Sequence, residues 1–196
     1  VTPKNGTIAW TDVTPPEVPA PPKSRQDVNI EIPVPPEPAK ATGFASVLPK
    51  ESELPADAII VNATEFAAQG GGTVEGTSRK VGATGRAFLH WDRAGHWLEY
   101  LMTTPSAGTY ALRLRACSCE PAVLRGISVN GEVPGQCAAQ ELAGTGGFSG
   151  SQDDWRVFTV ADMQAEPTHF ILPKGEVRVR VENIDGRSLN LNWLAL

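Results

Sequence analysis

The residues that could carry chemistry by themselves are three histidines and a few acidic side chains. His90, His96 and His169 are scattered along the chain without a Gly-x-Ser-x-Gly phrase, so the pattern of a nucleophile beside a base is missing. Asp153-Asp154 and Glu99 could supply the two carboxylates of a glycosidase. Neighbouring acids in a glycine-rich loop are more typical of turn residues that face water. No phosphate-binding glycine motif occurs either. The sequence therefore predicts a protein that is not an enzyme.

Three cysteines are the remaining reactive groups. Cys117 and Cys119 are separated by one residue, which is too close for the paired cysteines of a metal site. A disulfide to Cys137 is one interpretation, in an oxidising compartment, and it would contribute about 3 kcal/mol by closing a short loop. Reduced, partly buried cysteines are the alternative.

Composition narrows the class of protein. The 196 residues carry a net charge of −5 and are 41% hydrophobic, which is enough for a packed core. Without a basic excess, the chain is not expected to bind nucleic acid. No apolar run approaches the roughly 20 residues of a membrane-spanning helix. The chain begins at Val1, and we expect it to be a processed form or a fragment.

The chain divides near residue 57, because twelve of its seventeen prolines lie in residues 1–57. Such a segment favours extended backbone and cannot bury enough surface to fold alone. One interpretation is a semi-rigid linker. The other is an extended arm that packs on its own domain or on a neighbouring chain, with apolar anchors at Trp10, Ile30, Val34 and Phe44.

From residue 58 onward the hydrophobic period changes to two, which is typical of half-buried antiparallel strands. Three runs show it, with apolar residues at Tyr110, Leu112, Leu114 and Ala116, at Val177, Val179 and Val181, and at Leu189, Leu191 and Trp193. Turns rich in glycine or proline separate the runs, and no helix of ten residues is expected. The sequence predicts an all-β, jelly-roll β-sandwich over residues 58–196, preceded by the proline-rich extended arm of residues 1–57.

Several phrases of this region resemble carbohydrate-binding modules of families 6 and 35, which have a galactose-binding-like β-sandwich. The phrases follow the order of those families over about residues 58–196: IIVNATEFAAQGGG (59–72), AGHWLEYLM (94–102), AGTYALRLRA (107–116), ISVNG (127–131), TGGF with a later Trp (145–155), LPKGEVRVRV (172–181) and LNLNWLAL (189–196). The resemblance implies a sandwich that binds a sugar without transforming it.

The same resemblance implies a sugar site in loops at one end of the sandwich. Two aromatic rings would hold the apolar face of a pyranose there, and an asparagine would bind its hydroxyl groups. Phe148 takes the place of the first ring, and Trp91 or Phe88 could supply the second. Asn190 is the first candidate for the asparagine, with Asn183 behind it.

Members of these families commonly hold a structural calcium ion between the first and last strands. The matching positions here are Asn62, Thr64 and Asn192. These are neutral side chains, whereas calcium prefers several charged oxygen ligands. We therefore expect no cofactor, or at most a weakened calcium site.

We predict a secreted module, extracellular or periplasmic, that tethers a partner or an assembly to a polysaccharide or another glycan. The alternative is a structural subunit of an extracellular assembly, in which residues 1–57 pack on a neighbouring chain and sugar binding has been lost.

Overall fold

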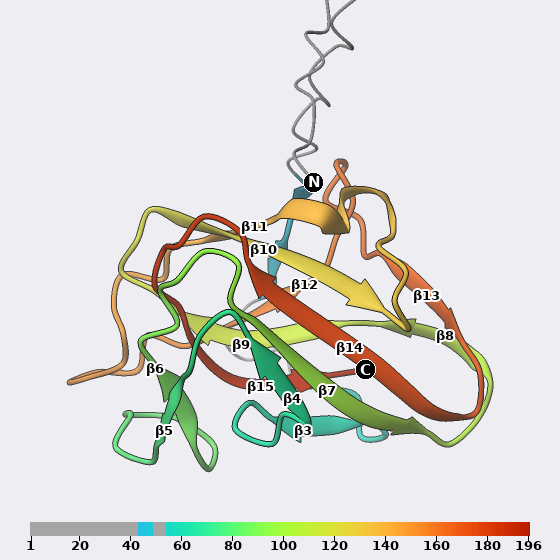
Figure 1. The fold of residues 1–196 in the computed structure, drawn as a ribbon, viewed down its shortest axis with the longest axis horizontal. Coiled ribbons are helices and arrows are strands. Elements are labelled where there is room, and N and C mark those ends of the chain that lie inside the picture. Colours follow the sequence, from blue (N-terminus) through green and yellow to red (C-terminus); the bar gives the residue numbers. More distant parts are fainter. Residues whose placement is uncertain (1–42, 49–53) are drawn as a thin grey trace, which may run out of the picture. The chain divides into compact units, whose positions relative to one another are not determined.

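The computed structural model describes residues 43–48 and 54–196, which form an antiparallel β-sandwich (Figure 1). The strands of the first sheet lie in the spatial order β1 (Gly43–Phe44), β11 (Gln140–Ala143), β10 (Ala122–Val129), β14 (Gly175–Asn183), β7 (Trp97–Thr104) and β4 (Ala68–Gly70). Those of the second sheet are β2 (Ser46–Leu48), β12 (Arg156–Thr159), β9 (Arg113–Cys117), β15 (Asn190–Ala195) and β3 (Ile60–Asn62). The predicted all-β sandwich is confirmed.

Two smaller sheets extend this body. β8 (Gly108–Ala111) pairs with β13 (His169–Leu172), and β5 (Glu75–Thr77) pairs with β6 (Ala87–Leu89). A short 3-10 helix, η1 (Gly135–Ala139), precedes β11. Within the part of the chain that the structure describes, no helix is long and apolar enough to cross a membrane.

Alternating side chains explain how the two sheets pack together. On β14, Val177, Val179 and Val181 are buried in the core between the sheets. Leu114 and Ala116 of β9 reach the same core from the opposite sheet. These positions were predicted from their spacing, and burying each valine or leucine side chain contributes about 1.5–3 kcal/mol.

Strand β15 departs from the predicted alternation. All six of its residues are buried, and its register on β9 shifts between Leu191 and Trp193. Leu191 and Leu194 therefore lie in the main core, whereas Trp193 packs in a separate cluster with Val157. The prediction that Leu191 and Trp193 share one face is wrong, because the bulge at Asn192 shifts the pleat by one residue.

A segment of the predicted arm belongs to the sandwich. β1 pairs in parallel with β11, and β2 pairs antiparallel with β12, so residues 43–48 add an edge strand to each sheet. Between these strands, the Ala45 amide donates to the Glu141 carbonyl at 2.9 Å. The predicted boundary between residues 57 and 58 stays a prediction. Of the proposed anchors, Trp10, Ile30 and Val34 lie outside the described residues, as does the side chain of Phe44.

Close backbone packing after β11 gives a test of the fold. A Cβ atom at Gly144 would overlap the Glu120 carbonyl oxygen, whereas a Cβ at Gly150 would meet open space. We expect Gly144→Ala to lower the free energy of unfolding by about 2 kcal/mol, since the backbone must move. Gly150→Ala is the matched control and should change it by less than about 0.5 kcal/mol. Urea unfolding measures both, and equal effects would contradict the packing.

Candidate functional site

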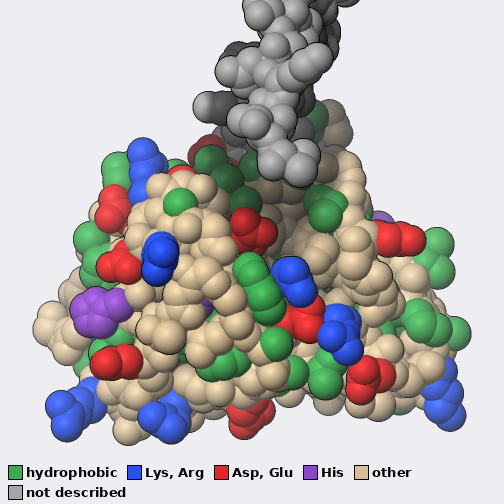
Figure 2. Space-filling model, in the orientation of Figure 1, with side chains coloured by type: hydrophobic (Ala, Val, Ile, Leu, Met, Phe, Trp, Pro, Cys, Tyr) green, Lys and Arg blue, Asp and Glu red, His purple; other side chains and the backbone are tan. Residues whose placement is uncertain are grey.

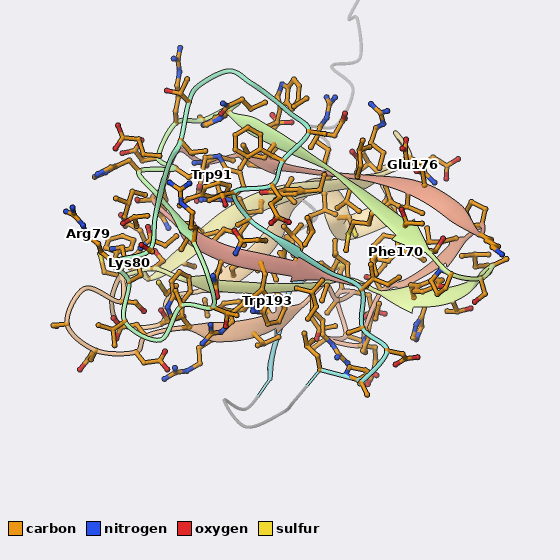
Figure 3. All side chains as sticks on the ribbon, turned by 90° about the horizontal axis from the view of Figure 1, so that it is seen from below. Arg79, Lys80, Trp91, Phe170, Glu176 and Trp193 are labelled. Carbon is orange, nitrogen blue, oxygen red and sulfur yellow. The ribbon has the colours of Figure 1, made fainter. Side chains whose placement is uncertain are left out.

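Two of the predicted sugar-stacking rings lie inside the protein. Trp91 and Phe88 are each 0% exposed, and their ring centroids are 6.2 Å apart in an edge-on contact. The Trp91 indole donates to the His96 carbonyl at 3.2 Å, and the Arg125 guanidinium lies 4.7 Å from the ring centroid. Figure 3 shows Trp91 within the body of the sandwich. The prediction of a stacking role is wrong for both rings, because neither has surface for a ligand.

Asn183 is also a structural residue. It is 0% exposed, and its side-chain oxygen accepts from the Gly186 amide at 2.9 Å and from Arg125 Nη1 at 3.1 Å. Its Nδ2 donates to the carbonyls of Trp91 and Arg187 at 3.0 and 3.2 Å. The prediction that it binds sugar hydroxyls is wrong, since these contacts use the whole amide to hold the turn after β14.

Asn190 and Phe148 are brought together at the loop end of the sandwich. Asn190 is 2% exposed, and its Nδ2 donates to the Phe148 carbonyl at 2.9 Å. Lys80, which lies at this end in Figure 3, donates to the same carbonyl at 2.7 Å. The Phe148 side chain is half-buried. The structure thus shows how this loop is held. The prediction that Asn190 binds sugar hydroxyls is wrong, because its side chain is buried against the loop backbone, whereas the role of the Phe148 ring in binding a sugar stays a prediction.

Of the three positions matched to calcium ligands, Asn62 and Asn192 meet at the backbone of Thr84, and Thr64 bonds to Asn62. The Asn62 side-chain oxygen accepts from the Thr64 amide at 3.1 Å and from its hydroxyl at 2.7 Å. Asn62 Nδ2 and Asn192 Nδ2 both donate to the Thr84 carbonyl, at 3.2 and 2.8 Å. The Asn192 side-chain oxygen in turn accepts from the Thr84 amide at 3.0 Å.

A guanidinium group completes this network. Arg115 Nη1 donates to the Asn192 side-chain oxygen and to the Gly82 carbonyl, each at 2.8 Å. Calcium requires six to eight oxygen ligands, typically with carboxylates among them. Here the oxygens already accept N–H groups and a positive charge lies beside them, so the residues do not fit a calcium ion. Among the described residues, no group of three or more His, Cys, Asp or Glu side chains could hold a metal.

The loop that contains Asp153 and Asp154 has a structural role. Asp154 is 5% exposed and accepts from the Ser149 amide and from Gln152 Nε2, each at 2.8 Å. Asp153 accepts from the Trp155 amide at 3.1 Å. The expectation of a water-facing turn residue is wrong for Asp154, because its carboxylate closes the loop that carries Phe148.

His90 and His169 are exposed, as strand-end residues commonly are, but His96 is not. Only 1% of its surface is exposed, and its Nε2 lies 3.3 Å from the Gln69 side-chain oxygen. Burial, together with the positive charge of Arg93, lowers the pKa of His96. It is therefore a neutral packing residue near pH 7.

All three cysteines are free thiols, so the predicted disulfide is wrong. Cys117 packs in a small cluster with Ala87 and Trp155, whereas Cys137 lies in the main core. Burial raises the pKa of the Cys117 thiol to about 11, and it also raises the pKa of Cys137. The alternative of reduced, buried cysteines fits these two, and Cys119 is exposed.

A large hollow lies on the outer face of the six-stranded sheet, across β10, β14 and β7. It has a volume of about 640 Å³ and is lined by Glu99, Ser128, Asn130, Gly131, Val133, Arg178, Arg180 and Glu182. A second hollow of about 170 Å³ shares four of these residues. In Figure 2, acidic and basic side chains lie beside one another near the middle of this face. We call the two hollows together the sheet groove.

A buried carboxylate organises the sheet groove. The Glu99 side chain is 7% exposed; Arg178 Nη1 and Arg180 Nη2 each donate to it at 2.8 Å. The Arg180 guanidinium also lies 4.0 Å from the centroid of the Trp97 ring. Burial alone would raise the pKa of Glu99, but the hydrogen bonds and charges of the two arginines outweigh it and lower that pKa. Glu99 is therefore charged near pH 7. The outward positions on β14 follow from the alternation of its valines in the sequence, but the pairing of Arg178 and Arg180 with Glu99 on β7 was not predicted.

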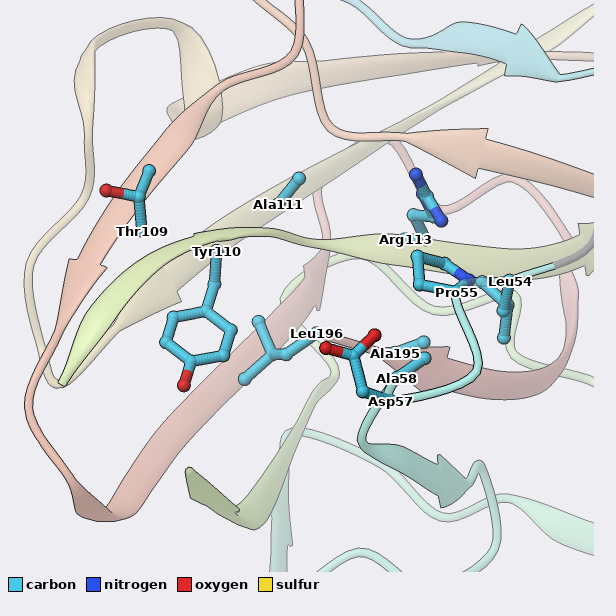
Figure 4. A pocket seen from close by; sticks show the side chains of 10 residues that line it. All are labelled: Leu54, Pro55, Asp57, Ala58, Thr109, Tyr110, Ala111, Arg113, Ala195 and Leu196. Carbon is cyan, nitrogen blue, oxygen red and sulfur yellow. The ribbon is translucent and has the colours of Figure 1, made fainter. Parts of the chain in front are cut away.

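A smaller hollow of about 210 Å³ lies on the other side of the sandwich (Figure 4). The Tyr110 ring and the aliphatic side chain of Leu196 line it together, with Asp57 beside them. The Tyr110 hydroxyl donates to the Ser106 carbonyl at 2.8 Å. This hollow of about 210 Å³ accommodates no more than a single small ring, so the sheet groove is the better candidate for a polymer.

Comparison with solved structures confirms the fold resemblance. The C-terminal family 6 carbohydrate-binding module of LamC, a laminarinase from Zobellia galactanivorans, is 19% identical with a TM-score of 0.51, and the match covers 71% of this chain and 98% of that one. A family 35 module from Clostridium thermocellum is 20% identical with a TM-score of 0.50, covering 77% and 95%. A family 35 module from Paenibacillus barcinonensis is 14% identical with a TM-score of 0.50, covering 70% and 97%.

The sandwich has the fold of carbohydrate-binding modules of families 6 and 35. No protein-family model matches the sequence, and a search of curated proteins also found no match. At these levels of identity the likeness concerns the fold alone.

The burial of Trp91 leads to a stability prediction. Trp91→Ala should lower the free energy of unfolding by about 3–5 kcal/mol, because it empties a core site and removes the ring beside Arg125. Phe148→Ala, at the half-buried loop position, should cost less than about 1.5 kcal/mol. Chemical denaturation of both variants measures the difference. A Trp91→Ala protein as stable as the wild type would contradict the core position.

The ion pairs of Glu99 predict a dependence on pH. Glu99→Gln should lower the free energy of unfolding at pH 7 by about 1 kcal/mol, since its two arginine partners are partly exposed. A lowered pKa stabilises the fold above the ordinary value of 4.5, and this contribution is lost as the pH falls through the folded-state pKa. The difference between wild type and Glu99→Gln should therefore persist at pH 5 and shrink as the pH falls further below 4.5. A constant difference across this range would contradict the ionised pair.

Proposed function

We propose that this protein binds a glycan chain along the sheet groove without transforming it. The observation that carries the proposal is the lining of the groove. It combines guanidinium, carboxylate, hydroxyl and amide groups within one open hollow of about 640 Å³. Sugar hydroxyls need many directional donors and acceptors, and an open groove suits a stretch of polymer better than a single ring.

The charges of the groove favour an uncharged glycan. Two arginines and two glutamates line it, so their formal charges cancel. Glu99 already pairs with both arginines. Among the residues that line the groove, no unpaired cationic group therefore remains for a strongly anionic polymer. Apolar surface is also present along its length, at Val133 (52% exposed) and Ile184 (38% exposed). Such surface suits the C–H faces of sugar rings.

The same groups argue against catalysis. A glycosidase needs one carboxyl group that carries a proton near neutral pH, which requires a raised pKa. The pKa of Glu99 is lowered instead, because Arg178 and Arg180 stabilise its charged form. A binding role is therefore the better reading of this carboxylate.

A non-catalytic module of this kind would act by tethering, outside the cell or in the periplasm. Holding a partner close to a polysaccharide raises their effective concentration without new chemistry. The structural-subunit alternative has less support, because residues 43–48 of the arm pair with the sheets of their own sandwich.

The groove can be tested by filling it. Ser128 lies on β10 opposite Arg180 and lines both hollows. Ser128→Ile should weaken binding of a neutral polysaccharide by at least about tenfold, because an apolar side chain replaces a hydroxyl and occupies the groove. Affinity electrophoresis against a panel of soluble glycans, followed by calorimetry, measures this effect.

Thr103→Ile is the matched control for that experiment. Thr103 is an exposed residue of β7 that does not line the groove, so this substitution should leave affinity unchanged. If no glycan binds the wild-type protein, the proposed function is wrong. If Phe148→Ala abolishes binding while Ser128→Ile has no effect, the glycan binds at the loop end and the groove assignment is wrong.

A further inference from the structure

We propose that the Arg115 guanidinium serves as the structural cation of this sandwich, so that the loop after β5 is fixed without calcium. Three backbone carbonyls of that loop, at Gly82, Thr84 and Arg86, point toward the second sheet. Arg115 donates to the first at 2.8 Å, and Asn192 Nδ2 donates to the other two at 2.8 and 3.2 Å. We call these residues, with Asn62, the arginine clamp.

The strands place the clamp residues side by side. Arg115 on β9 and Asn62 on β3 are both register partners of Trp193, which lies between them on β15. The bulge of β15 falls at Asn192, the residue before Trp193. One end of the second sheet therefore offers two amide groups and one positive charge to a single loop, and bulges commonly re-aim side chains in this way.

The acceptor atoms of the clamp are all in use by N–H or O–H donors. The Asn62 oxygen accepts twice from Thr64, and the Asn192 oxygen accepts from the Thr84 amide and from Arg115. A calcium ion on the Asn192 oxygen would have to displace these donors and would lie next to the guanidinium charge. Loop carbonyls that would otherwise need a metal are thus satisfied within the chain.

The clamp also reaches the loop that carries Phe148. The Arg115 guanidinium lies 5.6 Å from the centroid of the Trp155 ring, and the Trp155 indole donates to the Val81 carbonyl at 2.9 Å. The Val81 amide donates to the Ser149 carbonyl at 2.9 Å. Loss of the clamp should therefore loosen both loops at this end of the sandwich.

The first test needs only the wild-type protein. Its thermal midpoint should be the same, within about 1 °C, in excess calcium and in excess EDTA, and calorimetry with calcium chloride should give no saturable binding. A rise of several degrees with calcium, or a dissociation constant below about 1 mM, would overturn the proposal.

The second test compares two arginines of one strand. Arg115→Met should lower the thermal midpoint by about 5 °C, because hydrogen bonds from a charged group and a ring contact are lost. Arg113→Met is the matched control: Arg113 is also half-buried on β9, but its Nε has no hydrogen-bond partner among the described residues. It should shift the midpoint by no more than about 1 °C.

A local readout separates the clamp from general destabilisation. The Thr84 amide, which donates to Asn192, should exchange its hydrogen at least about tenfold faster in Arg115→Met, whereas amides of β14 should exchange as in the wild type. If Arg115→Met does not fold, Arg115→Lys retains the charge with fewer donors, and the same comparison is made on it. Unchanged Thr84 exchange, or equal midpoint shifts for the two arginine positions, would overturn the proposal.

Discussion

Strand β15 imposes the constraint on which the rest of the structure depends. It is buried along its whole length, yet it carries two asparagines, Asn190 and Asn192. A buried polar group must find hydrogen-bond partners, or it costs free energy comparable to a lost hydrogen bond. Each asparagine therefore binds the backbone of a loop, at Phe148 and at Thr84. In this way one internal strand fixes the loops at one end of the sandwich.

Buried charges follow the same rule on the other sheet. Arg125 is 0% exposed and lies against the Trp91 ring, and it bonds to Asn183 and Asp185. Glu99 takes up two arginines on the outer face. Both groups stabilise the fold only while their partners are present, since an unpaired buried charge is strongly unfavourable. In the sheet groove these ion pairs hold Glu99 against Arg178 and Arg180.

Burial that depends on period alone could be predicted from the sequence. The valines of β14 and the apolar side of β9 were correctly placed, because a strand buried on one face leaves its pattern in the sequence. Trp91, Phe88 and Asn183 were wrongly predicted, because they resemble ligand-binding residues by type but are 0% exposed. Residue type does not report exposure, which depends on how distant segments cover a side chain.

The sequence by itself determined the strand composition, the β-sandwich class and the absence of carboxylate ligands at the positions matched to calcium. Only the tertiary structure decided what replaced those ligands. Arg115 and Asn192 lie 77 positions apart, and Asn62 and Thr84 lie 22 apart. Their meeting depends on strand register and on one bulge in β15. Register is set by the packing of the whole sheet, so no local pattern in the chain could have shown that a guanidinium group lies among these oxygens.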